Sequence, residues 1–306
     1  MPFVANRGGG RRHFAVTQRR PRRIAAVAAV LVACSVALSL WIVVQVRDAR
    51  SRAVSSVLLI PRHPQGHTTR PAMISFATTL AACEARIEHG PHTAPTVAIV
   101  GASYTAGIGP DNPEQSWAVA LARQLRWNAV IYGVPGVGYV RTGATRRGPI
   151  ARMLSQESLR ALDPALVIVQ AGHDDIGLPA WLERRRVAAA VHLIHTAAPA
   201  ARIALLTTFA ISPDGSPALR QTDAAIVSAG TAAAPDAIIM DPLADRWVFP
   251  RARDGLHPTA AGDAWIARTA AAILLAHGVR PAPVTSTAPV ICDVSVGAGK
   301  PVSATA

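Results

Sequence analysis

The sequence predicts an α/β domain in which helices cover both faces of a parallel sheet. From residue 95 onward, short apolar stretches rich in β-branched residues alternate with longer helix-like stretches, which is the pattern of repeated βα units. The first short stretch, residues 97–100, is apolar at every position, as expected of a strand buried on both faces. The glycine at position 101 is expected to end that strand.

Five strand and helix pairs account for the middle of the chain. The predicted strands cover residues 97–100, 128–132, 165–170, 202–209 and 237–240. The predicted helices cover residues 114–126, 150–162, 180–196, 217–233 and 259–277, and a leading helix covers 72–88. We therefore expect one domain over residues 95–279 with a five-stranded parallel sheet. The tail, residues 280–306, is rich in Pro, Thr, Ser and Val, and we expect it to lie along the domain.

The segment before this domain has the pattern of a membrane anchor. Residues 1–23 hold seven arginines and no acid, and residues 24–46 form an uncharged run that is about 30 Å long as a helix. The basic flank predicts a cytoplasmic N-terminus, a single-pass helix at 24–46 and a domain outside the cytoplasmic membrane. A tether with the leading helix, residues 47–94, would join the two. A cleaved signal peptide is the alternative, for which Ser51 and Ala53 form a poor cleavage site.

The formal net charge of +13 comes mostly from the N-terminal segment. Residues 1–52 carry ten arginines and one acid, a net of +9, which leaves +4 for the remaining residues. Binding to nucleic acid requires basic charge gathered on a folded surface. Since the excess charge lies before the domain, we expect no nucleic-acid partner.

A serine directly after the first strand is the candidate nucleophile. Ser103 lies in the stretch TVAIVGASYTAGIG, at the carboxyl end of the strand, where open α/β sheets bind ligands. A phosphate-binding loop is excluded because Lys300 is the only lysine, and an α/β-hydrolase elbow because Thr105 stands where glycine is needed. A dinucleotide-binding fingerprint would need glycine at position 103. A cap for the next helix is the alternative role of this serine.

A base and its orienting group precede the last predicted helix. Two residues separate Asp254 from His257, so a turn can bring the carboxylate to one imidazole nitrogen and leave the other facing Ser103. A capping aspartate beside a solvated histidine is the alternative. Two other loops that follow strands, the glycine-rich loop 133–138 and the GHDD sequence at 172–175, are expected at the same rim of the sheet.

Together these stretches resemble the four conserved blocks of the SGNH (GDSL-like) hydrolases. They are VGASYTAG around Ser103, Gly136 in the second loop, GHDD at 172–175, and DGLHP from Asp254, and the resemblance covers roughly residues 95–278. It implies a flavodoxin-like three-layer sandwich with strand order 2-1-3-4-5, and ester or acyl-group hydrolysis without a metal or cofactor. It further implies that Ser103 is the nucleophile, that His257 is the base oriented by Asp254, and that the N–H groups of Ser103 and Gly136 bind the oxyanion.

Two positions depart from the pattern of this family. Ala102 replaces an aspartate that the chemistry does not require. Asp174 replaces the asparagine that donates to the oxyanion, and an ionised carboxylate there would repel the charge that it should stabilise. Asp174 can donate if it stays protonated, which burial and the neighbouring Asp175 favour. The alternatives are a catalytically impaired domain that binds glycans or lipids, and an acyltransferase.

Other candidates compete with this interpretation. A divalent cation could be held jointly by the GHDD sequence and by the loop before the last helix. The candidate ligands are His173, Asp174, Asp175, Asp254 and His257. His192 and His195 have helical spacing that suits a metal, but no acid accompanies them and we expect them on the surface.

The cysteines and aromatic residues each leave two alternatives. Cys83 and Cys292 flank the domain and can pair if it lies outside the cytoplasm, or can be separate buried thiols. Tyr104, Trp247 and Phe249 can line an acyl pocket or pack in the core. We expect a membrane-anchored, outward-facing serine esterase that acts on acyl esters of envelope lipid, polysaccharide or peptidoglycan.

Overall fold

The computed structural model describes residues 82, 85–87, 94–156, 159–211, 215–284, 288–296 and 304–305, all within the unit Ala72–Ala306. The predicted basic N-terminus, membrane helix and most of the tether lie outside the described residues, as does Cys83. Residues 82 and 85–87 are helical, inside the predicted leading helix. No helix among the described ranges combines the length and hydropathy needed to cross a bilayer.

Strands and helices alternate through most of the described chain. The strands are β1 (Thr96–Gly101), β2 (Asn128–Gly133), β3 (Leu166–Gln170), β4 (Arg202–Leu206), β5 (Ile238–Met240), β6 (Ile291–Asp293) and β7 (Ala304–Thr305). The helices are α3 (Trp117–Leu125), α4 (Ile150–Gln156), α5 (Leu159–Leu162), α6 (Ala180–Ala197), α7 (Pro217–Ala233) and α8 (Ala260–Ala276). Two short 3-10 helices, η1 (Pro113–Gln115) and η2 (His173–Asp175), precede α3 and α6.

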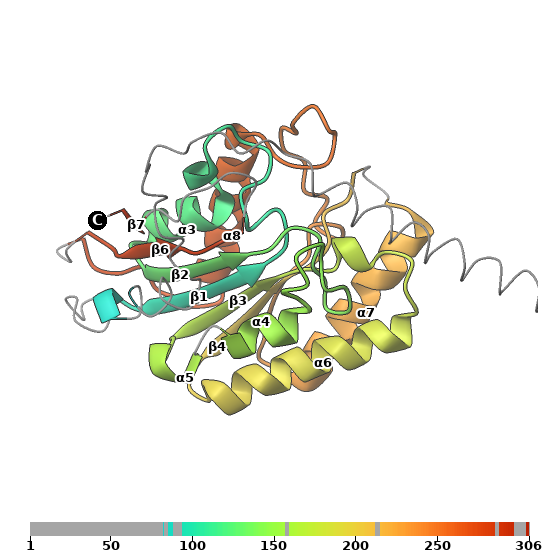
Figure 1. Ribbon diagram of the computed structural model, residues 1–306, viewed down its shortest axis with the longest axis horizontal. Coiled ribbons are helices and arrows are strands. Elements are labelled where there is room, and N and C mark those ends of the chain that lie inside the picture. The colour runs from blue at the N-terminus through green and yellow to red at the C-terminus, as the bar shows by residue number, and fades with distance from the viewer. Residues whose placement is uncertain are drawn as a thin grey trace, which may run out of the picture. The chain divides into compact units, whose positions relative to one another are not determined.

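The sheet lies between two helical layers. Helices α3 and α8 cover one face, and α4, α5, α6 and α7 cover the other (Figure 1). Successive residues of β1 point to opposite faces: Ile99 belongs to the apolar cluster that includes Trp117 of α3, and Val100 to the one that includes Val187 of α6. A strand buried on both faces must be apolar at every position, which is the pattern that predicted it.

The register of the central strands brings three loops to one place. Gly101 at the end of β1 pairs with Gly133 at the end of β2 and with Gln170 at the end of β3. All three strands run parallel, so the chain leaves the sheet at the same rim after each of them. These are the strands that precede Ser103, the glycine-rich loop and the GHDD sequence.

The prediction of a five-stranded sheet is wrong, because the C-terminal tail adds strands. Among the described residues the order is β5-β4-β3-β1-β2-β6-β7, which contains the expected order 2-1-3-4-5 and extends it beyond β2. Strand β6 runs parallel to β2, and β7 pairs antiparallel with β6. The tail satisfies the edge of β2: Val294 N–H donates to Ile131 O at 2.9 Å and Val296 N–H to Gly133 O at 2.8 Å.

Several element bounds differ from the predicted ones. The helix predicted at 114–126 starts at Trp117, because Ser116 caps it by accepting a hydrogen bond from Val119 N–H. The residues before it form η1, whose first residue is Pro113. Strand β4 ends at Leu206, three residues before the predicted end. The helix predicted at 150–162 corresponds to α4 and α5.

Candidate active site

The turn after β1 presents Ser103 at the rim of the sheet. The turn is closed by backbone hydrogen bonds from Ala106 N–H to Ala102 O and from Ile108 N–H to Ser103 O, each 3.0 Å long. A side chain at Gly101 would collide with Thr105 and with the backbone of Gln170, so only glycine allows the turn to approach β3 this closely.

Gln170 supports this turn from beneath, and sequence reasoning missed it. Its Oε1 accepts hydrogen bonds from Ala102 N–H at 3.2 Å and from the Thr105 hydroxyl at 3.0 Å. The Gln170 side chain is fully buried. The signal in the sequence was a single polar residue at the end of the apolar strand LVIVQ.

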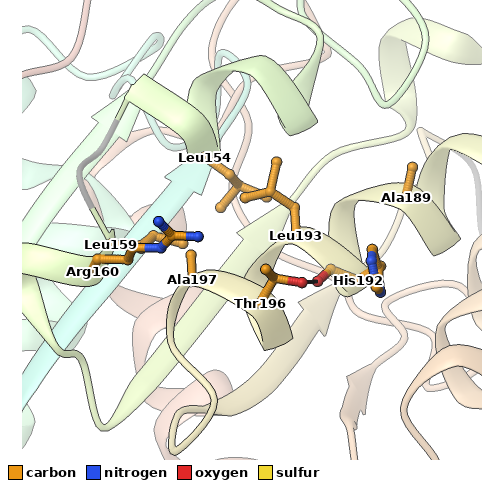
Figure 2. A pocket seen from close by; sticks show the side chains of 8 residues that line it. All are labelled: Leu154, Leu159, Arg160, Ala189, His192, Leu193, Thr196 and Ala197. Carbon is orange, nitrogen blue, oxygen red and sulfur yellow. Dashed lines mark hydrogen bonds between the residues drawn. The ribbon is translucent and has the colours of Figure 1, made fainter.

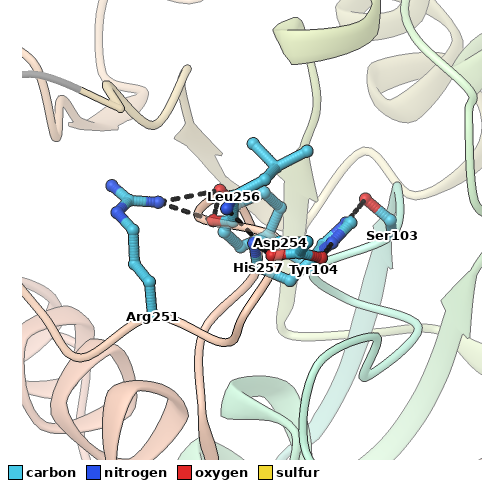
Figure 3. A network of polar contacts seen from close by, with 6 residues as sticks. All are labelled: Ser103, Tyr104, Arg251, Asp254, Leu256 and His257. Carbon is cyan, nitrogen blue, oxygen red and sulfur yellow. Dashed lines mark hydrogen bonds and ion pairs between the residues drawn. The ribbon is translucent and has the colours of Figure 1, made fainter.

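Ser103, His257 and Asp254 form a continuous chain of hydrogen bonds. Ser103 Oγ lies 2.8 Å from His257 Nε2, and His257 Nδ1 lies 2.7 Å from Asp254 Oδ2 (Figure 3). Ser103 comes from the turn after β1, and Asp254 and His257 come from the loop before α8. The serine and the histidine are 154 residues apart in the sequence. The expected meeting of these loops at one rim is therefore what the geometry shows.

The turn from Asp254 to His257 is held by the same carboxylate. Asp254 Oδ1 accepts hydrogen bonds from Leu256 N–H at 2.9 Å and His257 N–H at 3.0 Å, while Oδ2 faces the imidazole. The hydrogen bond from His257, followed by that from Leu256, lowers the pKa of Asp254 to about 2. The carboxylate therefore stays ionised across the range in which an esterase would work.

Arg251 ties the catalytic loop to two neighbouring loops. Its guanidinium donates to Leu256 O at 2.6 Å and to the Tyr104 hydroxyl at 3.3 Å from one nitrogen, and to Ala210 O from the other. The guanidinium also lies 4.4 Å from the centre of the Phe249 ring. Figure 3 shows it on the side of Leu256 away from Ser103. Sequence reasoning missed this residue, which no motif marks.

The three aromatic residues proposed near the site are all buried. Tyr104 stacks on Phe209 with ring centres 4.4 Å apart, and its hydroxyl donates to Leu256 O at 2.7 Å. Burial raises the pKa of Tyr104 to about 12, so its hydroxyl stays neutral. Trp247 and Phe249 pack in the same cluster and also line a small pocket of about 100 Å³ beside Arg251. Of the two roles expected from the sequence, Tyr104 has the packing role. Trp247 and Phe249 pack in the core and also line a pocket.

The two backbone donors expected for the oxyanion have no protein acceptor within the described residues. Neither Ser103 N–H nor Gly136 N–H makes a hydrogen bond there. Gly136 has φ of +77°, a conformation that favours glycine. The start of its loop is fixed because Gly133 N–H donates to Ser295 Oγ of the C-terminal tail at 2.8 Å.

Asp174 lies in η2 and is half-buried. Its pKa depends on burial and on the neighbouring charged groups. Burial first, and then the charge of Asp175, raise the pKa of Asp174 to about 6, against a smaller lowering by His257. The carboxyl is therefore neutral below about pH 6 and charged above it. His173, beside it, has its pKa lowered by burial, and its ring lies 6.5 Å from that of Tyr104.

The residues of the metal alternative do not gather around one point. No group of three or more His, Cys, Asp or Glu side chains suited to a metal occurs among the residues that the structure describes. Asp175 turns inward and accepts hydrogen bonds from Val140 and Arg141 N–H. His192 is exposed and His195 partly exposed on α6, as expected.

A larger pocket lies away from these residues. It has a volume of about 520 Å³ and is lined by residues of α4, α5 and α6, among them Leu154, Arg160, His192 and Leu193 (Figure 2). Within it the Thr196 hydroxyl donates to His192 O at 2.9 Å. None of its lining residues belongs to the Ser103, His257 and Asp254 chain.

Cys292 lies in β6, is fully buried and is disulfide-bonded. Its expected partner, Cys83, lies outside the described residues, so the pairing of Cys83 with Cys292 stays a prediction.

A model of the GDSL-like lipase/acylhydrolase family matches residues 99–265, more than half of the chain. The chain belongs to this family. The matched range includes Ser103, Gly136, Asp174, Asp254 and His257. Membership in the GDSL-like family makes the protein an esterase or acylhydrolase. Comparison with curated proteins found no match.

Several solved structures resemble this GDSL-like protein at low sequence identity, and one of them reaches a TM-score of 0.50. A carbohydrate esterase family 2 enzyme with a carbohydrate-binding domain, from Corynascus thermopiles (Myceliophthora fergusii), is 21% identical with a TM-score of 0.50, covering 62% of this chain and 68% of its own. Est24, a carbohydrate acetylesterase from Sinorhizobium meliloti, is 16% identical with a TM-score of 0.48, covering 60% and 99%. The esterase EstA from Pseudoalteromonas sp. is 18% identical with a TM-score of 0.46, covering 60% and 97%.

Proposed function

We propose that this GDSL-like hydrolase is a serine esterase that uses Ser103, His257 and Asp254. The observation that carries the proposal is the hydrogen-bond chain from Ser103 Oγ to His257 Nε2 at 2.8 Å and from His257 Nδ1 to Asp254 Oδ2 at 2.7 Å. This is the relation of nucleophile, base and orienting group that activates a serine hydroxyl.

The proposed reaction has two halves. Ser103 Oγ attacks the acyl carbon while His257 Nε2 takes its proton, and the leaving alcohol then receives that proton as the acyl-enzyme forms. Water attacks the acyl-enzyme in the second half, with His257 again taking the proton and returning it to Ser103. Asp254 keeps the imidazole oriented and stabilises its charged form.

Oxyanion stabilisation is assigned to the N–H groups of Ser103 and Gly136 and to the protonated carboxyl of Asp174. The two N–H groups have no acceptor within the described residues, so they are available to a ligand. Donors fixed before the reaction stabilise the charge that develops on the acyl oxygen without reorganisation.

The proposed substrates are acyl esters of envelope lipid, polysaccharide or peptidoglycan, met outside the cytoplasmic membrane. This assignment rests on the uncharged run at residues 24–46 and its basic flank. The carbohydrate esterase from Corynascus shares the fold, which is compatible with an acylated glycan among these substrates. The same residues also support transfer of the acyl group to an acceptor other than water.

One observation favours a second candidate function. Asp174 stands where an amide donor is expected, and a charged carboxylate at that place would weaken catalysis. A domain impaired in this way would bind acylated glycans or lipids without turning them over.

The test is ester hydrolysis by the full chain with short and long nitrophenyl esters. We expect hydrolysis that EDTA does not inhibit, and a loss of at least about 10³-fold in kcat for Ser103→Ala. Ser228→Ala on α7, which removes a serine outside the catalytic chain, is the matched control and should keep its activity. Retained hydrolysis in Ser103→Ala would contradict the serine mechanism.

A further inference from the structure

A buried carboxylate of η2 holds the loop that carries Gly136. Asp175 Oδ1 accepts a hydrogen bond from Arg141 N–H at 2.9 Å, and Oδ2 accepts one from Val140 N–H at 3.2 Å. The Asp175 side chain has no solvent exposure. A carboxylate buried in this way makes strong, charge-assisted hydrogen bonds, which fix the loop after β2 against η2.

Gly138 allows the carboxylate to reach the loop. A Cβ at this position would collide with all three carboxyl atoms of Asp175, so the carboxylate lies directly against the Gly138 backbone. The φ of Gly138 is not in the left-handed region, so glycine is needed here for space rather than for conformation. Gly138 N–H donates to Arg141 O, and its own carbonyl accepts from Ile150 N–H, each at 3.0 Å. The turn two residues after Gly136 is therefore fixed on both sides.

Glu183, in the first turn of α6, completes this arrangement. Its side chain is 1% exposed, and neither carboxyl oxygen accepts a hydrogen bond from an N–H or hydroxyl donor among the described residues. The Asp175 carboxyl is the charged group that acts on Glu183, as Glu183 acts on Asp175. Two buried carboxyl groups that interact repel each other when both are charged, so one of them keeps its proton. Two N–H bonds to Asp175 favour its charged form and none reaches Glu183, so Glu183 is the group that keeps the proton.

The surroundings of the pair favour one proton and one negative charge. Burial, followed by the charge of Asp175, raises the pKa of Glu183 to about 9. The other titratable groups nearby are Tyr139, which is buried and neutral, and Asp174 on η2. On the packed helices, Arg152 of α4 turns to Arg146 O, and Asp223 of α7 accepts from Thr208. No cation among the described residues neutralises Glu183.

We propose that Asp175 and Glu183 are positioning residues that hold the Gly136 loop beside the Ser103 turn and so form the oxyanion site. The proposal rests on the proposed function. Asp175 directly follows Asp174, so one carboxylate links the two elements that flank the acyl oxygen. Its loss should weaken transition-state stabilisation more than substrate binding, because the oxyanion develops only during the reaction.

The first test compares kcat and KM of full-length variants near neutral pH. Asp175→Asn puts an N–H₂ group against the loop N–H donors, and we expect kcat to fall about tenfold or more with little change in KM. Glu183→Ala should lower kcat in the same way. Glu183→Gln, whose amide can donate to Asp175 as a protonated acid does, should restore most of the kcat that Glu183→Ala loses. An Asp175→Asn variant with wild-type kcat, or no rescue by glutamine, would overturn the proposal.

The second test is the alkaline pH dependence of kcat, measured after subtraction of spontaneous hydrolysis. In the wild type, Glu183 loses its proton as the pH rises through about 9, and two buried carboxylates then repel each other and release the loop. We expect an alkaline loss of kcat that Glu183→Gln lacks and that the control Glu114→Gln, on the surface, retains. The same alkaline loss in Glu183→Gln would contradict the proposal even if Asp175→Asn fails to fold. Failure of the proposed function would instead show as no hydrolysis by the wild type.

Discussion

At the scale of residues, Asp254 performs two tasks with its two oxygens. Sequence reasoning left a choice between a capping aspartate and an orienting one. Oδ1 caps the turn through the N–H groups of Leu256 and His257, while Oδ2 contacts the imidazole. Thr259 caps α8 instead, by accepting from Gly262 N–H. The spacing D-x-x-H is therefore compatible with both uses at once, because a carboxylate has two acceptor oxygens.

The pKa of Asp254 is lowered, which keeps its carboxylate ionised down to strongly acidic pH. Its value of about 2 lies below the ordinary 3.8, so the stability that it contributes is present above its ordinary value and is lost as the pH falls toward 2. Any loss of activity at pH 4 to 6 therefore has a cause other than protonation of Asp254.

The pKa of Asp174 is shifted in the opposite direction, upward, and this gives a prediction for the pH dependence of kcat. Since its pKa is raised to about 6, the carboxyl is a neutral donor below that pH and a repelling anion above it. Asparagine stays a neutral donor throughout. We expect the ratio of kcat for Asp174→Asn over wild type to be near one at about pH 5 and to rise toward about 10²-fold at about pH 8, where about one wild-type carboxyl in a hundred keeps its proton.

The measurement for Asp174 is kcat across this range with one nitrophenyl ester. Asp111→Asn, an exposed aspartate beyond the Ser103 turn, provides the control and should give a constant ratio. A constant ratio for Asp174→Asn as well would show that its carboxyl does not face the oxyanion.

At the scale of elements, the sequence located the central strands well. Continuous apolar stretches mark β1 and β3, and the loops after them carry glycine and polar residues, so the rim that collects the site could be inferred from parallel pairing. Strand β6 could not be found in this way. It has three residues, lies in a tail rich in Pro, Thr and Ser, and forms because the edge of β2 offers unpaired backbone groups.

The supporting contacts of the site were also beyond sequence reasoning. Gln170 reaches the Ser103 turn, and Asp175 reaches the loop after β2, only because the sheet register brings them together. No periodicity encodes such contacts. The glycines at positions 101 and 138 gave an indirect signal, since each marks a place where a neighbouring chain segment lies too close for a side chain.

Strand β6 gives a prediction about stability. Its Cys292 is disulfide-bonded, and Ser295, two residues after the strand, fixes Gly133 at the start of the Gly136 loop. We expect Cys292→Ser, or reduction of the full chain, to lower the free energy of unfolding by about 2–4 kcal/mol. Chemical unfolding with and without reductant measures this, and Cys34→Ser is the control. Alkylation and mass analysis then identify the partner, which we expect to be Cys83; a different partner would refute the pairing.

At the scale of the whole molecule, the proposed anchor precedes the described domain in the sequence. The run at residues 24–46 predicts a single-pass helix with the N-terminus inside. We expect the full chain to stay in the membrane fraction after a high-salt or carbonate wash, and the domain to be open to protease added from outside. A mature N-terminus near residue 54 would instead show that the segment is a cleaved signal peptide.

The whole account depends on an activated serine at the rim of the sheet, and covalent labelling tests it most directly. A fluorophosphonate probe reacts only with a serine whose hydroxyl is activated by its neighbours. We predict one label per chain, located at Ser103 by mass analysis of peptides, with labelling abolished in Ser103→Ala and strongly slowed in His257→Ala. A folded wild-type chain that takes no label, or a label on another residue, would contradict the serine esterase and favour the impaired binding domain.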